Sequence, residues 1–251
     1  MLEERPYVIS IAGFDPSAGA GVLADIKTFE QHGVYGFGVS SALTVQTDSD
    51  FLSLEWIGAD QILNQIKPLL SKFNISACKI GLIENSQVLL KITSYLKSIN
   101  PTMKIVLDPV WKASAGYEIN NWKKDLATLK KSLVHVDLIT PNLDEMKILS
   151  ESSDLILSAI LWARECPVLL KGGHNETDPA VDFLFEKEDI FEIRGPKISS
   201  YPKHGSGCIL SSAIASNLAM GFPLLIACKK AKTYIGKFLN SNPTLLGYHT
   251  V

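Results

Sequence analysis

The chain has 251 residues, of which 46% are hydrophobic and 20% are charged, and its formal net charge is −2. This composition is typical of a globular protein and not of a disordered one. The small net charge gives no global field that would attract nucleic acid or an anionic membrane, and no apolar run approaches the roughly 18–20 residues that span a bilayer. The length predicts a single domain, 1–251, rather than two ordinary ones.

The four cysteines are scattered along the sequence, with no CxxC motif and no Cys/His pair at zinc-ligand spacing. We therefore expect reduced thiols and a cytoplasmic protein. The first predicted strand begins near Tyr7, so we expect no signal peptide before the folded core.

Strand-like and helix-like segments alternate along the chain. Short apolar runs predict buried strands at 7–12, 38–45, 77–82, 104–108, 136–139 and 168–170. Amphipathic stretches predict helices from Val22 to a stop at Gly33, near 60–72, 86–97, 122–133 and 154–164, and at 208–220 and 224–239. Two further runs, 180–185 and 190–194, are typical of an antiparallel hairpin near a sheet edge. This order predicts an α/β fold, a doubly wound, mostly parallel sheet with helices on both faces.

Such sheets bind ligands at the carboxyl ends of their strands, and four segments with unusual residues fall there. The first runs from Gly13 to Gly21, between a strand and a helix. Its glycines allow a ligand to approach the backbone closely, although a tight turn is the plainer interpretation. Asp25 follows in the first turn of the helix, where it either complements the helix dipole or binds a ligand.

The second segment begins with Asp108-Pro at the end of a predicted strand, and the small residues of 112–116 suit a mobile flap. Asp108 either holds magnesium or marks the way out of the strand. The third segment contains Asn142 and Glu145, three residues apart and so on one helix face. These two residues either cap a helix or orient magnesium-bound waters and phosphate.

The fourth segment, His204-Gly-Ser-Gly-Cys208, opens a predicted helix. Two glycines at a helix N-terminus expose N–H groups that can cradle a phosphoryl group. We expect the helix dipole to lower the pKa of the Cys208 thiol, which would make the thiolate accessible near neutrality. The alternative for a single cysteine is an inert core residue.

In this order, the segments resemble the ribokinase superfamily and, within it, the hydroxymethylpyrimidine/phosphomethylpyrimidine kinases of thiamine biosynthesis. The resemblance covers nearly the whole chain. It rests on Ile11-Ala-Gly-Phe-Asp, Gly19-Ala-Gly, Ala24-Asp-Ile-Lys-Thr-Phe29, Ala42-Leu-Thr-Val-Gln46, Lys79-Ile-Gly81, Val106-Leu-Asp-Pro-Val110, Thr140-Pro-Asn-Leu-Asp-Glu145, Leu170-Lys-Gly-Gly-His174 and the fourth segment.

The resemblance implies an ATP-dependent kinase that phosphorylates 4-amino-5-hydroxymethyl-2-methylpyrimidine and its monophosphate, with Mg²⁺ as cofactor. It implies substrate contacts from Gly13, Ala20, Asp25, Gln46, Leu82 and Val110. In this family Asp25 and Gln46 would hydrogen-bond the ring, whereas Leu82 and Val110 would line it.

The resemblance further implies nucleotide contacts from Asn142 and Lys171 and a metal site at Asp108 and Glu145. Gly205, Ser206 and Gly207 would form the anion hole, and Cys208 would be the general base. The expected partners are the small-molecule substrate and ATP, with no nucleic acid and no membrane. We also expect a homodimer.

The sequence departs from the family at Leu82, where methionine is common, and at Ser206, where threonine is usual. Related enzymes phosphorylate pyridoxal, some with a cysteine in the flap. This flap has Ala113 instead, which favours the pyrimidine over the pyridoxal alternative. Two other classes stay open: a non-catalytic binding protein of kinase descent, and a dehydrogenase that uses Gly19-x-Gly21 with an acid such as Asp48.

Overall fold

The computed structural model of the chain describes residues 4–112, 119, 122–150, 152–172, 181–195 and 201–249. Within these ranges nine strands form one sheet, in the order β3-β2-β1-β4-β5-β6-β7-β8-β9. The strands are β1 (Tyr7–Phe14), β2 (Tyr35–Gln46), β3 (Phe51–Trp56), β4 (Ile75–Ile80), β5 (Lys104–Leu107), β6 (Leu138–Ile139), β7 (Val168–Leu170), β8 (Val181–Glu186) and β9 (Asp189–Arg194). The helices are α1 (Gly21–Gln31), α2 (Ala59–Lys72), α3 (Ser86–Ile99), the short 3₁₀ turn η1 (Trp122–Asp125), α4 (Leu126–Leu133), α5 (Leu143–Leu149), α6 (Leu155–Ala163), α7 (Ser206–Ala219) and α8 (Leu224–Leu239).

The six strands from β2 to β7 across the middle of the sheet run parallel. β3 at one edge and the β8–β9 hairpin at the other edge are antiparallel to their neighbours. The prediction of a doubly wound, mostly parallel sheet with an edge hairpin is therefore confirmed.

β3 escaped the sequence analysis. It lies at the edge of the sheet and has no buried residue, so its hydrophobic pattern is weak. For α5 the sequence offered only the capping residues Asn142 and Glu145, because seven residues are too few to display a helical period.

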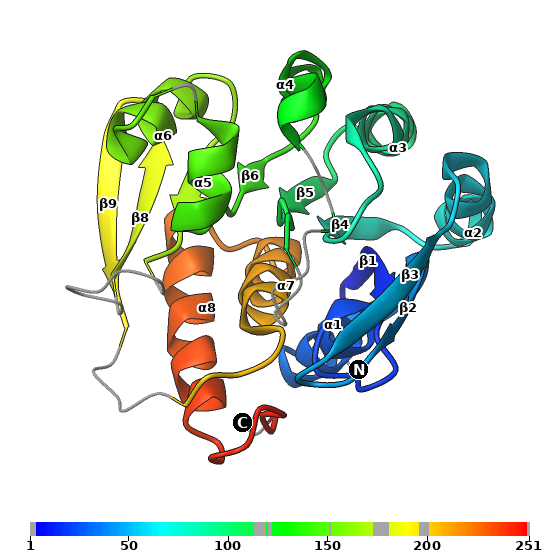
Figure 1. Ribbon diagram of the computed structural model, residues 1–251. Helices are drawn as coiled ribbons and strands as arrows, with labels where there is room; N and C mark the ends of the chain where they lie inside the picture. Colours follow the sequence, from blue (N-terminus) through cyan, green and yellow to red (C-terminus); the bar gives the residue numbers. More distant parts are fainter. Residues whose placement is uncertain are drawn as a thin grey trace.

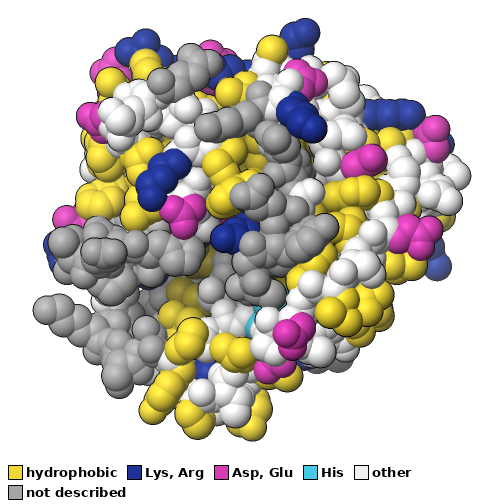
Figure 2. All heavy atoms as spheres, in the orientation of Figure 1, with side chains coloured by type: hydrophobic (Ala, Val, Ile, Leu, Met, Phe, Trp, Pro, Cys, Tyr) yellow, Lys and Arg dark blue, Asp and Glu magenta, His cyan; other side chains and the backbone are white. Residues whose placement is uncertain are grey.

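Helices cover both faces of the sheet (Figure 1). α1, α7 and α8 pack on one face around a core that includes Phe29 and Ile214. α2, α3, α4 and α6 cover the other face. On the face seen in Figure 2, basic and acidic side chains are interspersed, in keeping with the small net charge. Among the described residues, no helix has the length and apolar character needed to cross a bilayer.

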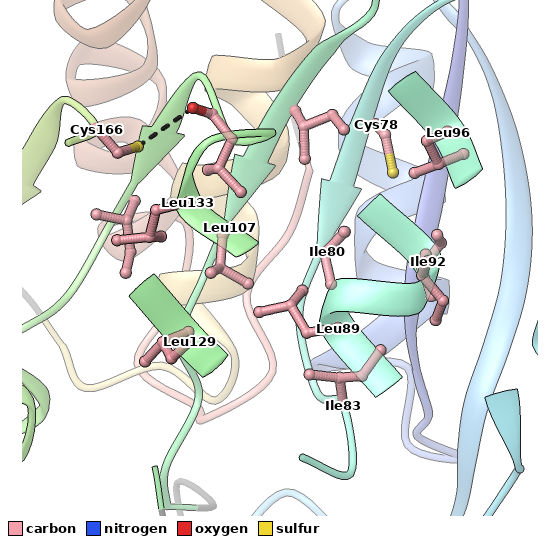
Figure 3. Packing of buried hydrophobic residues seen from close by; sticks show 14 of the residues in the cluster. Cys78, Ile80, Ile83, Leu89, Ile92, Leu96, Leu107, Leu129, Leu133 and Cys166 are labelled. Carbon is pink, nitrogen blue, oxygen red and sulfur yellow. Dashed lines mark hydrogen bonds between the residues drawn. The ribbon is translucent and has the colours of Figure 1, made fainter. Parts of the chain in front are cut away.

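The packing of β4 shows why the central strands are largely apolar. Cys78 and Ile80 point toward α3, where they meet Leu89, Ile92 and Leu96 (Figure 3). All five side chains are fully buried. Because helices cover both faces, a central parallel strand has no solvent-facing side to make polar. Each such side chain contributes about 1.5–3 kcal/mol when it is removed from water.

The four cysteines, as expected, are free thiols. Cys166 donates a hydrogen bond from Sγ to the Val136 carbonyl oxygen at 3.3 Å (Figure 3).

A charged pair lies inside the layer between the sheet and α7. Lys79 of β4 donates to both carboxylate oxygens of Asp25 of α1, at 3.0 and 2.8 Å. Ser10 of β1 and Ser212 of α7 donate their hydroxyls to the same carboxylate, at 2.5 and 2.6 Å. All four residues have no exposed surface. Burial alone would lower the pKa of Lys79, but Asp25 holds it above its usual value. One buried carboxylate thus joins four elements beneath the carboxyl edge of the sheet.

We predict that Lys79→Met destabilises the protein by about 3–5 kcal/mol, because it leaves the Asp25 carboxylate charged and buried without its partner. The double variant Lys79→Met/Asp25→Asn removes both charges and should recover at least half of that loss. Urea unfolding curves of the three proteins measure both effects. A single variant that loses less than about 1 kcal/mol, or a double variant no more stable than the single one, would show that the pair has another role.

Candidate active site

A cavity of about 780 Å³ opens at the carboxyl edge of the sheet, between the loop that follows β1 and the N-terminus of α7. Because the six middle strands are parallel, the residues that follow them meet at this edge. All but one of the predicted site residues line the cavity: Gly13, Ala20, Gln46, Leu82, Asp108, Val110, Asn142, Glu145, Lys171, Gly205, Ser206, Gly207 and Cys208.

Asp25 is the residue that the structure does not bring to the cavity. Its carboxylate has no exposed surface and is held by Lys79, Ser10 and Ser212. The Asp25 side chain points into the protein interior and does not line the cavity, so this arrangement does not place it to hydrogen-bond a substrate ring as predicted. The sequence motif around Asp25 does not indicate that Lys79, 54 residues later, forms an ion pair with this carboxylate.

The loop of residues 13–21 contacts the turn of residues 204–207. We call them the substrate loop and the phosphate turn, after the contacts that the family resemblance predicts for them. Gly205 has φ +72°, and a Cβ atom there would lie 2.1 Å from the Gly19 carbonyl oxygen. Gly21 has φ +61°, and its Cβ would lie 2.2 Å from the Gly13 carbonyl oxygen. Only glycine fits at these two positions, on grounds of both backbone conformation and space.

The part of the cavity beside the substrate loop combines an amide with apolar side chains. Gln46, at the end of β2, donates from Nε2 to Thr44 Oγ1 at 2.9 Å, and Thr44 donates to the Phe14 carbonyl oxygen at 2.8 Å. This chain of hydrogen bonds fixes the orientation of the Gln46 amide. Leu82 lies close to Gly13, where a Cβ would be 2.8 Å from Leu82 Cδ2. The sequence analysis missed Thr44, whose orienting role depends on the contact between β2 and the loop after β1.

Three buried charges form the opposite part of the cavity. Lys171, directly after β7, donates to Asp108 Oδ1 at 2.8 Å and lies 3.5 Å from Glu145 Oε2. Thr140 also donates to Asp108 Oδ1, at 3.2 Å. Burial alone would lower the pKa of Lys171, but the two carboxylates hold it above its usual value. One ammonium therefore faces two carboxylates, which leaves the cluster with a net negative charge when both are ionised.

Glu145 caps α5 and also belongs to this cluster, so the capping interpretation is confirmed while the metal role stays a prediction. Asn142 accepts the Glu145 backbone N–H at 2.8 Å, and Glu145 Oε2 accepts the Asn142 backbone N–H at 2.7 Å. These reciprocal bonds form the capping box of α5. Asn142 is also paired with Lys171 in an isolated parallel bridge, which aligns the starts of the two segments.

The donor set suits a hard cation that takes further ligands from a nucleotide. Burial raises the pKa of Glu145 to about 7, with Asp108 acting in the same direction and Lys171 opposing it. A divalent cation nearby would supply the positive charge that the second carboxylate lacks. The described residues contain no group of three or more acidic, histidine or cysteine side chains able to hold a metal alone. One or two carboxylates with phosphate and water ligands are how proteins usually hold Mg²⁺.

Other cavity residues carried no sequence signal for a site. Lys232 of α8 forms an ion pair with Asp182 of β8 at 2.7 Å, and Asp182 accepts the Gly172 backbone N–H at 2.9 Å. Apolar and polar residues from distant segments complete the lining, among them Phe51, Trp111, Lys112, Ile119, Leu210, Ile235 and Leu239. Only tertiary packing brings the hairpin and α8 to this edge. The predicted flap residues 113–116 lie outside the described ranges.

Cys208 lines the cavity in the first turn of α7, but its electrostatic environment differs from the prediction. Burial raises the pKa of the Cys208 thiol, and Asp25 and Asp108 add to this effect. Lys79 and the Gly21 backbone N–H oppose it without reversing it. The expectation that the helix dipole makes the thiolate accessible near neutrality is therefore wrong for this state of the protein. Loss of hydration, which disfavours the charged thiolate, is the largest of these effects.

A doubly wound sheet with a glycine-flanked helix N-terminus, a lysine and two carboxylates at its carboxyl edge defines the ribokinase-like class of phosphotransferases. Comparison with known proteins narrows this class. Residues 15–250 match the family model described as phosphomethylpyrimidine kinase. The chain belongs to this family, which confirms the family predicted from the sequence and leaves no support for the dehydrogenase alternative.

Individual relatives agree with this assignment. The hydroxymethylpyrimidine/phosphomethylpyrimidine kinase of Aquifex aeolicus is 36% identical over 94% of this chain and 95% of its own length. A crystal structure of phosphomethylpyrimidine kinase from Clostridium difficile is 30% identical, with a TM-score of 0.75 over 93% of this chain and 99% of that one. Pyridoxal kinase from Staphylococcus aureus, solved with ADP, has a TM-score of 0.84 over 98% of this chain and 94% of its own. Its identity is only 23%, so this likeness shows the shared fold.

The environment of Cys208 predicts how the thiol reacts. Cys78, Cys166 and Cys228 are buried, and burial raises the pKa of each, so alkylation of the native protein reports on Cys208. Because the pKa of Cys208 is also raised, its alkylation rate with iodoacetamide should climb about tenfold per pH unit through pH 8 and beyond, following the thiolate fraction. Stopped reactions between pH 6 and 9, with Cys208→Ser as the blank, measure this. A rate that levels off below pH 7 would restore the lowered pKa expected from the sequence.

Proposed function

We propose that this protein is an ATP-dependent kinase that phosphorylates the hydroxymethyl group of 4-amino-5-hydroxymethyl-2-methylpyrimidine and then the resulting monophosphate, as a step of thiamine biosynthesis. The observation that carries the proposal is one cavity with two chemically different halves. A glycine-rich helix start and a lysine suit phosphates, and an oriented amide with apolar neighbours suits a small heteroaromatic ring. The family assignment supports the same acceptor.

The phosphate half has the groups that phosphoryl transfer requires. The reaction needs little covalent help from the protein, and it depends on positioning and on neutralising charge. The backbone N–H groups of Gly205, Ser206 and Gly207 form the anion hole in this proposal, at the positive end of the α7 dipole. A Cβ at Gly207 would lie 3.3 Å from Lys171 Nζ, so the lysine stands beside the anion hole and can reach the phosphates of ATP.

Asp108 and Glu145 would hold Mg²⁺ together with the phosphates of ATP. When bound, the ion supplies positive charge to the phosphate oxygens. Asp108 Oδ2 lies toward the anion hole, since a Cβ at Gly207 would be 3.5 Å from it. Lys171 holds the other oxygen of the same carboxylate, so the Asp108 side chain is oriented before any ligand arrives.

Cys208 is the proposed general base. The hydroxymethyl oxygen attacks the γ-phosphorus, ADP leaves with the electron pair of the broken bond, and the hydroxyl proton passes to Cys208 Sγ. Because burial raises the pKa of this thiol, the thiolate is a minor species near neutrality but a strong proton acceptor. Lys79 is the cation that opposes this rise, and so favours the thiolate, from within the core.

Gln46, Leu82 and Val110 are the proposed contacts to the ring, and Gly13 and Ala20 let the ring approach the backbone. Pyridoxal is the competing acceptor, since it carries a hydroxymethyl group on a ring of similar size. The second phosphorylation, the homodimer and the 1–251 single domain stay predictions from the sequence.

The test is an ADP-release assay with Mg-ATP and three acceptors side by side: hydroxymethylpyrimidine, its monophosphate and pyridoxal. We expect kcat/KM for hydroxymethylpyrimidine to exceed that for pyridoxal by about tenfold or more, because a site built on hydrogen bonds penalises a ligand that leaves them unmade. A preference for pyridoxal would assign the protein to the alternative activity. Binding of the pyrimidine without ADP release would indicate a non-catalytic protein.

The same assay tests the base. Cys208→Ala should lower kcat by about 100-fold or more, the usual contribution of a general base, with little change in KM. Gly33 follows the C-terminal end of α1 with φ +70° and does not line the cavity, so it offers a control: Gly33→Ala strains the backbone there and should lower the melting temperature but keep kcat. Near-normal turnover by Cys208→Ala would remove Cys208 from the mechanism and leave the acceptor preference as a separate result.

A further inference from the structure

His204, the first residue of the phosphate turn, is joined to the substrate loop by a buried hydrogen bond. His204 Nε2 lies 2.8 Å from Asp15 Oδ2, and both residues are at most 5% exposed. Burial alone would raise the pKa of Asp15, but hydrogen bonds from His204, Ser17 and Ala20 hold it below its usual value. Asp15 is therefore a carboxylate that can only accept, and His204 Nε2 is the donor.

The same carboxylate shapes the substrate loop. It accepts the backbone N–H groups of Ser17 and Ala20, at 2.8 and 2.9 Å, as well as the Ser17 hydroxyl at 2.9 Å. Ala20 lines the cavity beside Gly13 and Gly21. Asp15 thus connects the backbone that contacts the substrate with the side chain that begins the phosphate turn.

A second tie comes from the end of the chain, residues 241–249, which we call the C-terminal loop. Lys203 Nζ donates to the carbonyl oxygens of Asn242 and Thr244, both at 2.5 Å, and to Asn242 Oδ1 at 3.1 Å. The backbone N–H of His204 donates to the Leu245 carbonyl oxygen at 3.0 Å. The C-terminal loop therefore binds the side chain of residue 203 and the backbone N–H of residue 204.

The C-terminal loop also reaches the substrate loop and is itself anchored. A Cβ at Gly19 would lie 2.7 Å from Leu246 Cδ2 and 2.5 Å from the His204 ring, so Leu246 and His204 pack directly on the loop. Tyr234 of α8 is hydrogen-bonded to His249 Nδ1 at 2.9 Å. The substrate loop, the phosphate turn and the C-terminal loop therefore pack against one another and share hydrogen bonds.

We propose that Lys203 and His204 are positioning residues, which hold the anion hole at the correct place relative to the substrate loop and make the C-terminal loop part of the catalytic machinery. The proposal rests on the proposed function, because it concerns where the phosphoryl group and the acceptor hydroxyl meet. Lys203 Nζ already has three oxygen acceptors, and His204 Nε2 is engaged by Asp15, so neither needs to touch a ligand to act. A displacement of about 1 Å in such a site can cost about 100-fold in rate.

The experiment compares Lys203→Met and His204→Leu with the parent protein. For each we measure kcat, KM for ATP and for hydroxymethylpyrimidine, the melting temperature, and the affinity for Mg-ADP with and without aluminium fluoride, a mimic of the transferring phosphoryl group. We expect kcat to fall by about 10–100-fold while each KM changes by less than about threefold. The gain in Mg-ADP affinity on adding aluminium fluoride should shrink by the same factor as kcat, and affinity for Mg-ADP alone should stay unchanged.

Two control variants separate positioning from stability. His204→Gln keeps a donor nitrogen near the place of Nε2, and its kcat should lie within about threefold of the parent value. Lys97→Met removes an ammonium with similar partners, the Met103 carbonyl oxygen at 2.6 Å and Asp137 at 2.9 Å. Lys97 lies at the end of α3, near the amino ends of the strands and away from the cavity. Lys97→Met should lower the melting temperature and leave kcat and the aluminium fluoride effect intact. If His204→Leu does not fold, His204→Asn, which is too short to reach Asp15, takes its place.

The proposal is overturned if Lys203→Met and His204→Leu behave like Lys97→Met, with a lower melting temperature and parental kcat. It is also overturned if KM rises while kcat stays, since that result would make these residues ligand contacts. Those outcomes leave the proposed function standing, because the parent still turns over. A parent protein that shows neither turnover nor tighter Mg-ADP binding with aluminium fluoride would instead remove the proposed function, and this inference with it.

Discussion

The active site depends on how closely the phosphate turn approaches the substrate loop. The Gly205 backbone sits so near the Gly19 carbonyl oxygen that no side chain fits between them. This contact brings the start of α7, with its unpaired N–H groups, beside the strand ends that carry Gln46 and Leu82. Any looser packing would separate the phosphate from the acceptor hydroxyl, and phosphoryl transfer is sensitive to that distance. Two glycine motifs about 185 residues apart in sequence therefore act as one structural feature.

Two of the buried charged groups near this contact have different roles. The Lys79–Asp25 pair is balanced and sealed in the core, where it joins β1, β4, α1 and α7. The cluster around Lys171 has one ammonium for two carboxylates and opens into the cavity. A balanced buried pair holds elements in place, whereas an unbalanced cluster at an opening attracts a cation and, with it, a nucleotide. Position and charge balance, rather than residue type, separate the structural carboxylate Asp25 from the carboxylates that line the cavity.

Sequence reasoning succeeded where local pattern decides the outcome. Buried strands such as β7 are apolar on both faces, and parallel strands bring the residues that follow them to one edge, so Asp108 and Glu145 were predicted to meet there. Lys171, which only the family resemblance pointed to, joins them. It failed where a distant partner decides. Asp25 was assigned to the substrate because its motif shows neither Lys79 nor Ser212, and the pKa of Cys208 was misjudged because hydration loss depends on packing. No local sequence pattern indicated that α8 lines the cavity or that the C-terminal loop contacts the phosphate turn.

In the proposed mechanism the acceptor ring and the phosphoryl group meet across the contact between Gly205 and Gly19. A crystal structure with hydroxymethylpyrimidine, Mg-ADP and aluminium fluoride tests this most directly. We predict the ring against Gln46, Leu82 and Val110, its hydroxymethyl oxygen within hydrogen-bonding distance of Cys208 Sγ, and the fluoride on the N–H groups of residues 205–207. A ring bound instead at the far wall of the cavity, against Leu210, Ile235 and Leu239, would contradict the account.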